Sequence, residues 1–212
     1  MLEIQSIGGP FLKEMYRQKL LKKLYSYCPL NEEEQAAQKQ TITFVESHKD
    51  CFERSCQEGH LTGSAWVENF DGTKFLLCYH KKLKNWVHLG GHTEPGEHDV
   101  LQIALREVKK ESGLKSLICL DREIFNIAIH WFDVGKERPH FHFDICFLLK
   151  SIDPTEKIKV SDESEDVRWF SELSQNKHGV GDDNVFQMFK NGNSVNIVLP
   201  AMLDKYPWCL IL

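Results

Sequence analysis

The chain predicts an α/β protein in which helices sandwich a mixed β-sheet, with a helical extension before the sheet. In residues 10–47, apolar side chains recur at the three- or four-residue spacing of helices, and from Leu61 the spacing changes to that of strands. One amphipathic helix lies between predicted strands, and further helices are expected at the end. With 212 residues, of which 42% are hydrophobic, we expect one domain with extensions.

Two helices open the chain. The first, over residues 10–27, is predicted from apolar residues that recur every four positions: Leu12, Tyr16, Leu20 and Leu24. The other face of this helix is basic and is expected to meet solvent: Lys13, Arg17, Lys22 and Lys23. After Pro29, Asn31 is a favourable N-cap for a second helix that runs to about Ser47, with three glutamates in its first turn. We expect the second helix to bury Ala36, Ile42, Phe44 and Val45.

Strands follow in two groups. The first group is predicted at residues 61–68, 74–80 and 86–89, with a hairpin turn at Asp71-Gly72. The second group is predicted at residues 117–120, 124–132, 140–149 and 167–170, and terminal helices at about 183–190 and 193–205.

A glycine-rich turn at residues 90–97 leads into the central helix, which is the most informative part of the chain. Asp99 is a suitable N-cap for a helix from about Val100 to Ser112, and Gly113 ends it. Glu107 and Glu111 lie four positions apart and therefore share one helix face. Two convergent carboxylates beside a bare backbone turn can hold Mg²⁺, which prefers oxygen ligands.

The pattern Gly91, Glu97, Arg106-Glu107, Glu111 and Gly113-Leu114 closely resembles the signature of the Nudix hydrolases. The resemblance covers roughly residues 60–175 and implies the Nudix α/β/α sandwich. We therefore expect a helical extension at 1–58, a Nudix core at 59–175 and C-terminal helices packing on it at 176–212. The segment 1–58 resembles the leading segment of a bacterial Nudix subgroup that shares a longer signature loop.

The chain departs from the signature twice. Eight residues separate Glu97 from Arg106, one more than the pattern, and we expect the additional residue in the loop before the helix. Lys110 stands where the family usually has a metal-binding carboxylate. A charged lysine cannot be a metal ligand. Three alternatives stay open: the site holds fewer ions, Lys110 contacts a substrate phosphate, or its side chain points into solvent.

By resemblance, the reaction is hydrolysis of a diphosphate bond in a nucleoside diphosphate derivative, with Mg²⁺ or Mn²⁺ as cofactor. Glu107 would be metal ligand and general base, Glu111 the second ligand, and the Gly90 carbonyl a third. Glu163 aligns with a further family carboxylate, with an exposed acidic loop as the equal alternative. Glu97 and Arg106 would pair and, with Gly91, support the site.

Histidines form a second conspicuous group. His140, His142 and Asp144 share one face of a predicted strand, His130 lies on the preceding strand, and His92 is in the glycine turn. This set could bind a transition metal, contact substrate phosphate or base, or form a hydrogen-bonded patch. We take His92, His140, His142 and Lys110 as candidate substrate-binding residues.

Composition limits the partners. The net charge of −5 gives no global basic field for nucleic acid or anionic membrane, and the sequence shows neither a signal peptide nor a transmembrane run. Seven cysteines without a C-x-x-C pair indicate free thiols in a reducing, cytoplasmic setting. We expect a small nucleotide-type substrate and allow a homodimer. The alternatives are a nucleotide-binding module that has lost catalysis, which Lys110 favours, and a partner-binding protein using the N-terminal helices.

Overall fold

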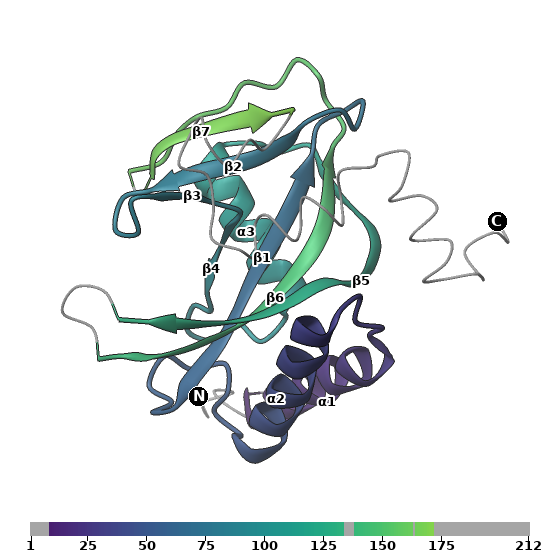
Figure 1. Ribbon diagram of the computed structural model, residues 1–212, viewed down its shortest axis with the longest axis vertical. Coiled ribbons are helices and arrows are strands. Elements are labelled where there is room, and N and C mark those ends of the chain that lie inside the picture. The colour runs from purple at the N-terminus through teal and green to yellow at the C-terminus, as the bar shows by residue number, and fades with distance from the viewer. Residues whose placement is uncertain (1–8, 134–137, 163, 172–212) are drawn as a thin grey trace, which may run out of the picture. The chain divides into compact units, whose positions relative to one another are not determined.

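The computed structural model describes residues 9–133, 138–162 and 164–171 (Figure 1). The helices are α1 (Gly9–Ser26), α2 (Glu32–Ser47) and α3 (Val100–Ser112). The strands are β1 (Gly59–Glu68), β2 (Phe75–His80), β3 (Asn85–Val87), β4 (Leu89–His92), β5 (Leu117–Phe132), β6 (His140–Ser151) and β7 (Ser164–Phe170). The predicted α/β class, with helices beside a mixed sheet and a helical segment before it, is confirmed.

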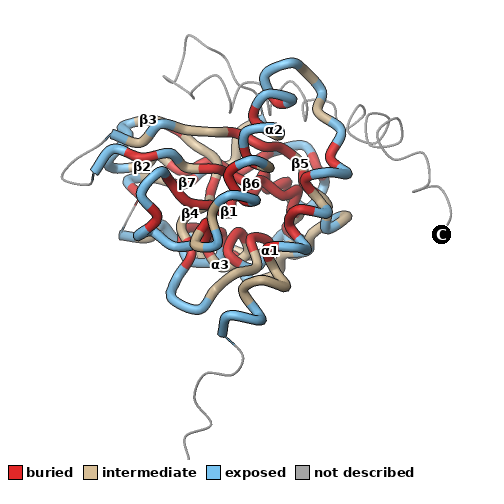
Figure 2. Tube along the Cα trace, turned by 90° about the horizontal axis from the view of Figure 1, so that it is seen from below, coloured by how far each residue is buried: buried red, intermediate tan, exposed pale blue. Residues whose placement is uncertain are grey.

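The described strands form one sheet in the order β3-β2-β1-β6-β5, with β4 on β1 and β7 on β2. Strand β1 is buried along its whole length (Figure 2). Contacts group the described residues into two compact units. The first contains the residues up to Ala65 together with Gly90–Glu107 and Asp121–Phe147, and the second contains Trp66–Leu89, Val108–Leu120 and the residues from Leu148 on.

In the first unit, α1 packs on α2 with Leu20, Leu21 and Leu24 buried, whereas Leu12, at the start of the four-residue spacing, is exposed. Arg17, expected on the solvent face, is buried instead. Its guanidinium donates to the Val45 carbonyl at 2.7 Å. Val45 lies in the last turn of α2, where carbonyl groups have no partner within the helix. An arginine from the neighbouring helix satisfies this one.

Helix α2 begins as predicted, because the Asn31 side chain accepts a hydrogen bond from the Glu34 N–H at 2.8 Å. Its buried face differs slightly from the prediction: Ala37 is buried and Ala36 is exposed. Phe44 is buried as predicted and stacks on Phe143 of β6, with ring centroids 3.9 Å apart. Helix α2 therefore covers β6.

A buried carboxylate fastens α2 to a second strand of the same unit. Glu34 is 4% exposed and accepts hydrogen bonds from the Tyr27 hydroxyl and the Asn126 amide, each at 2.9 Å. Asn126 lies on β5. A buried charge is tolerated where several donors satisfy it. The N-terminal helices thus share hydrogen bonds and apolar contacts with the sheet.

Strands β1 and β2 form the predicted hairpin, with Glu68 opposite Phe75 and Gly72 at a φ of 72°. The single strand expected at 86–89 is two strands, because β3 ends at Val87 and β4 begins at Leu89. β3 pairs with β2, whereas β4 pairs with β1. Strand β2 also pairs with β7 over six residue pairs.

The two strands expected at 117–120 and 124–132 are one continuous strand, β5. Arg122 takes the left-handed conformation, with a φ of 61°, and marks the position where the sequence suggested a break. The predicted C-terminal helices lie outside the described residues. None of the described helices is long and apolar enough to cross a membrane.

Candidate active site

The central helix α3 has the bounds that the sequence predicts. Asp99 caps it, since its carboxylate accepts from the Leu101 N–H at 3.1 Å, and Gly113 ends it at a φ of 73°. The apolar stripe is buried, with Ile103, Ala104 and Val108 fully inaccessible. The helix is uninterrupted and Glu107 lies against Gly91, which agrees with the expectation that the additional residue of the signature is in the loop before the helix.

The glycine turn lies against the first of the two glutamates. A Cβ at Gly91 would stand 2.9 Å from Cδ and 3.2 Å from Oε1 of Glu107. A Cβ at Gly90 would stand 2.4 Å from the Cβ of Ser64 on β1. Glycine is therefore required at position 90, where the clash is with Cβ and backbone, and a side chain at position 91 would displace the Glu107 carboxylate. Glu107 is only 5% exposed, so its carboxylate is held against bare backbone and away from bulk water.

Arg106 and Glu97 make the contact expected from the sequence. The guanidinium donates to both carboxylate oxygens of Glu97 at 2.8 Å, and also to the His92 carbonyl at 2.8 Å. A third contact joins Arg106 to Glu107. Burial alone would raise the pKa of Glu97, but the hydrogen bonds from Arg106 and the Glu94 N–H outweigh it and leave the pKa lowered. The hydrogen bond with Glu97 also raises the pKa of Arg106.

Helix α3 continues to Glu111, one turn beyond Glu107 and 3% exposed. Two buried carboxylates one turn apart on one helix are costly unless positive charge is near. Arg106 supplies one positive charge, to Glu107. Oxygen ligands of this kind fit a hard divalent cation. Lys110, in contrast, is exposed.

Glu163, the predicted further carboxylate, lies outside the described residues. On either side of it, Asp162 and Glu165 are exposed. Glu165 forms an ion pair with Lys84, with 2.6 Å between the carboxylate oxygen and the ammonium nitrogen. Exposed acidic residues thus lie on both sides of position 163, Asp162 in the loop before β7 and Glu165 on β7 itself.

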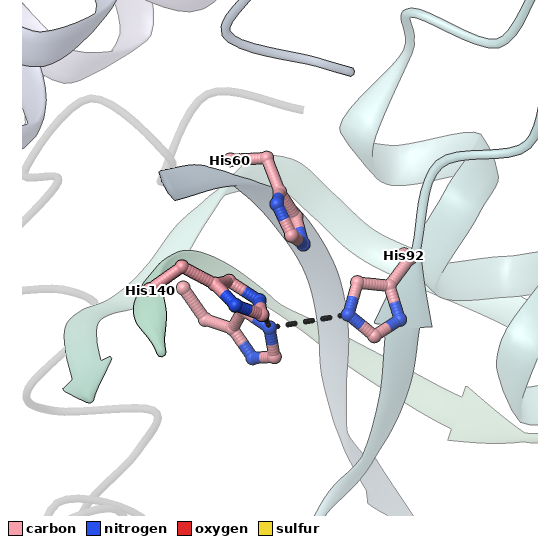
Figure 3. Close-up of side chains that lie close together, drawn as sticks. His60, His92 and His140 are labelled. Carbon is pink, nitrogen blue, oxygen red and sulfur yellow. Dashed lines mark hydrogen bonds between the residues drawn. The ribbon is translucent and has the colours of Figure 1, made fainter. Parts of the chain in front are cut away.

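Four histidines meet in the first unit. One ligand nitrogen from each of His60, His92, His140 and His142 lies within 4.8 Å of the others, and the labelled rings turn toward one another in Figure 3. The sequence indicated three of the four. It missed His60, and His130 is not a member of this histidine cluster. Burial, together with repulsion from the other three rings, lowers the pKa of His142 to about 2, so this ring is neutral.

A signal for His60 was present in the sequence. His60, Thr62 and Ser64 alternate on β1, and His140, His142 and Asp144 alternate on the neighbouring strand β6. Asp144, 4% exposed, accepts hydrogen bonds from the hydroxyls of Thr62 at 2.6 Å and Ser64 at 2.5 Å. Once β1 and β6 are known to be neighbours, the two alternations place His60 on the same face of the sheet as the histidines of β6.

The family model of the NUDIX domain matches residues 60–188, which is more than half of the chain. The chain belongs to the Nudix hydrolase family. Nudix hydrolases act on phosphoric anhydride bonds and generally use divalent metals, so the predicted class of enzyme is confirmed at that level. No curated protein sequence matches the chain.

Several solved structures are similar to this Nudix hydrolase. A Nudix-family hydrolase from Clostridium perfringens is 23% identical, with 65% of this chain and 98% of that chain covered and a TM-score of 0.48. A C. elegans Ap4A hydrolase binary complex is 19% identical, with coverages of 71% and 96% and a TM-score of 0.42. The NUDIX domain of Shewanella oneidensis NrtR, complexed with ADP ribose, is 13% identical, with coverages of 68% and 93% and a TM-score of 0.48.

Proposed function

We propose that this Nudix hydrolase cleaves a diphosphate bond in a nucleoside diphosphate derivative, with Mg²⁺ held by Glu107 and Glu111. The burial of both carboxylates on one face of α3, with Glu107 against the backbone of Gly91, carries this proposal. The residues fit the ion because carboxylate and carbonyl oxygens are the ligands that Mg²⁺ takes. Mn²⁺ is the proposed alternative to Mg²⁺ at the same ligands. The Gly90 carbonyl and Glu163 complete the proposed ligand set.

When bound, the cation would neutralise phosphate oxygens and lower the pKa of a coordinated water. Glu107 is the proposed proton acceptor. Its contact with Arg106 orients the carboxylate, and Glu97 accepts hydrogen bonds from the same guanidinium. Arg106 also fixes the turn through the His92 carbonyl. The bare backbone at Gly91 leaves room for Glu107 to approach the turn.

A substrate contact is proposed for Lys110, and His92, His140 and His142 are the competing candidates, whose alternative role as metal ligands is argued below. Lys110 is exposed on α3 one residue before Glu111, where a cationic side chain can reach a phosphate. His92 and His142 are half-buried, whereas His140 is 7% exposed and less able to reach a ligand directly. The six described cysteines are free thiols, which supports a cytoplasmic setting as part of this proposal.

Phosphate release from a panel of nucleoside triphosphates, ADP-sugars, dinucleoside polyphosphates and coenzyme A, with and without Mg²⁺, tests the proposal. Turnover should require the metal, and Glu107→Gln should lower it by roughly 10² or more. Glu33→Gln, an exposed glutamate of α2, is the matched control and should retain wild-type turnover. Tight nucleotide binding without turnover would instead identify a binding module that has lost catalysis.

A further inference from the structure

The histidine cluster defined above, His60, His92, His140 and His142, draws ligands from three parts of the chain. His60 lies at the start of β1, His92 ends β4, and His140 and His142 begin β6. His60 is 2% exposed and His140 7% exposed, so these two rings are withdrawn from solvent. The convergence of these four imidazole rings, two of them buried, requires a chemical explanation.

Hydrogen bonding within the cluster does not supply that reason. His140 Nδ1 lies 2.6 Å from the Arg138 carbonyl, which can only accept, so Nδ1 carries a hydrogen. With the hydrogen on Nδ1, the lone pair of an imidazole is on Nε2, which lies 2.9 Å from Nε2 of His142. That nitrogen of His142 lies also 3.1 Å from Nε2 of His92.

An imidazole nitrogen offers either one hydrogen or one lone pair, in the plane of the ring. His142 Nε2 can therefore satisfy only one of its two contacts at a time. Three Nε2 atoms directed at one region need an acceptor of several lone pairs. A metal ion is such an acceptor. The bond from His140 Nδ1 to a backbone carbonyl is also the outer contact that metal-ligating histidines typically make.

We propose that His60, His92, His140 and His142 bind one transition-metal dication of the Zn²⁺ type, with a donor set distinct from the carboxylates of α3. Imidazole suits Zn²⁺ and its first-row neighbours, whereas Mg²⁺ takes oxygen. At a Zn–N distance of about 2.0–2.1 Å, a tetrahedron separates its nitrogens by about 3.3 Å. The observed separations of 2.9 and 3.1 Å are close to that value.

Four protein ligands describe a closed site of the structural kind. Asp144, buried on the same face of β6 as His142, supplies a negative charge within the same unit. The ion would join β1, β6 and the glycine turn. The turn is also held from the other side, because Arg106 donates to the backbone carbonyl of His92. A metal ion bound by the histidine cluster would therefore stabilise His92, whose carbonyl accepts the hydrogen bond from Arg106.

The test is a calorimetric titration of the metal-stripped full chain with Zn²⁺ in excess Mg²⁺. All proteins carry Cys28→Ser, because Cys28 is an exposed thiol and a competing ligand. We expect one Zn²⁺ per chain, a rise in melting temperature on binding, and the visible spectrum of tetrahedral Co²⁺ when Co²⁺ replaces Zn²⁺. His142→Gln should weaken Zn²⁺ binding about 100-fold or more, since losing an outer partner alone costs 10–100-fold.

His130→Gln is the matched control, since this histidine of β5 lies outside the histidine cluster, and it should bind Zn²⁺ as the wild type does. His60→Asn is the second ligand variant in case His142→Gln does not fold. Glu107→Gln should keep the Zn²⁺ site, which separates this inference from the proposed hydrolase chemistry. Absence of stoichiometric Zn²⁺ binding, or equal affinity in wild type and both ligand variants, would overturn the proposal. If His142→Gln and His60→Asn raised the KM for nucleotides without any change in Zn²⁺ binding, that result would also overturn the proposal. It would favour contact between these histidines and the substrate.

Discussion

Replacing Glu97 or Arg106 should show how much the ion pair between them contributes to the free energy of unfolding. Two hydrogen bonds of 2.8 Å join the side chains, which are 28% and 24% exposed. Bonds to charged groups contribute about 1.5–3 kcal/mol each when buried, and exposed pairs about 0–1. For this half-buried bidentate pair we expect a coupling energy of about 1–2 kcal/mol, within the range of contacting residues.

The two single replacements should differ. Arg106→Ala also removes the contacts with Glu107 and the His92 carbonyl, so it should destabilise the fold more than Glu97→Ala. The double variant should cost little more than Arg106→Ala alone, because Glu97 loses its main partner in either case. Arg106→Ala should also lower turnover more, since Glu107 loses its neighbouring charge.

Urea unfolding of wild type, both single variants and the double variant gives the coupling energy directly. Glu94→Ala is the control, because Glu94 lies 3.5 Å from Arg106 and is 62% exposed. It should change the free energy of unfolding by less than about 0.5 kcal/mol. Single-variant effects that simply add in the double variant would refute the coupling inferred from the contact.

Three further predictions concern the same region. Gly91→Ala should destabilise the fold by about 1–3 kcal/mol and lower turnover, because its Cβ would meet the Glu107 carboxylate, whereas Gly9→Ala, with open space around it, should be silent in thermal unfolding. Lys110→Glu should tighten Mg²⁺ or Mn²⁺ binding in calorimetry and raise the number of ions bound. A higher KM with unchanged metal affinity would instead place Lys110 on a substrate phosphate, and no change in either would place it in solvent. The pKa of Glu97 is lowered in the folded protein, so its contribution to stability is present above its unfolded pKa of about 4.3 and is lost as pH falls through the folded value. The stability difference between wild type and Glu97→Gln should therefore shrink in acid, and a difference that is constant from pH 7 to pH 3 would contradict this.

Local signals predicted α3 and its turn well. Asp99 and Gly113 act on backbone groups within one turn of the helix ends, so the sequence alone specifies both bounds. The pair of Glu97 and Arg106 was also readable, because both residues match the signature although one additional residue separates them. The position of Ala37 on the buried face of α2, in place of Ala36, depends on which side of the helix the sheet covers, and no local rule supplies that.

Contacts between distant segments were the harder part. The strand expected at 86–89 is divided because β3 and β4 pair with different strands, which only the sheet order reveals. His60 joins His140 across 80 positions of sequence through the neighbouring strands β1 and β6. Alternation on each strand was visible separately, but their register was not. Arg17 was misplaced for the same reason, since its acceptor lies on another helix.

The fastening of α2 to the sheet has a consequence for how the protein unfolds. Phe44 stacks on Phe143, and Glu34 binds the Asn126 amide, so residues before the NUDIX match complete the packing of β5 and β6. A chain shortened to start at residue 59 would leave Phe143 without its stacking partner and Asn126 without this carboxylate. The N-terminal helices and these two strands should therefore lose their amide protection together in hydrogen exchange, as one cooperative unit that crosses the boundary of the recognised domain.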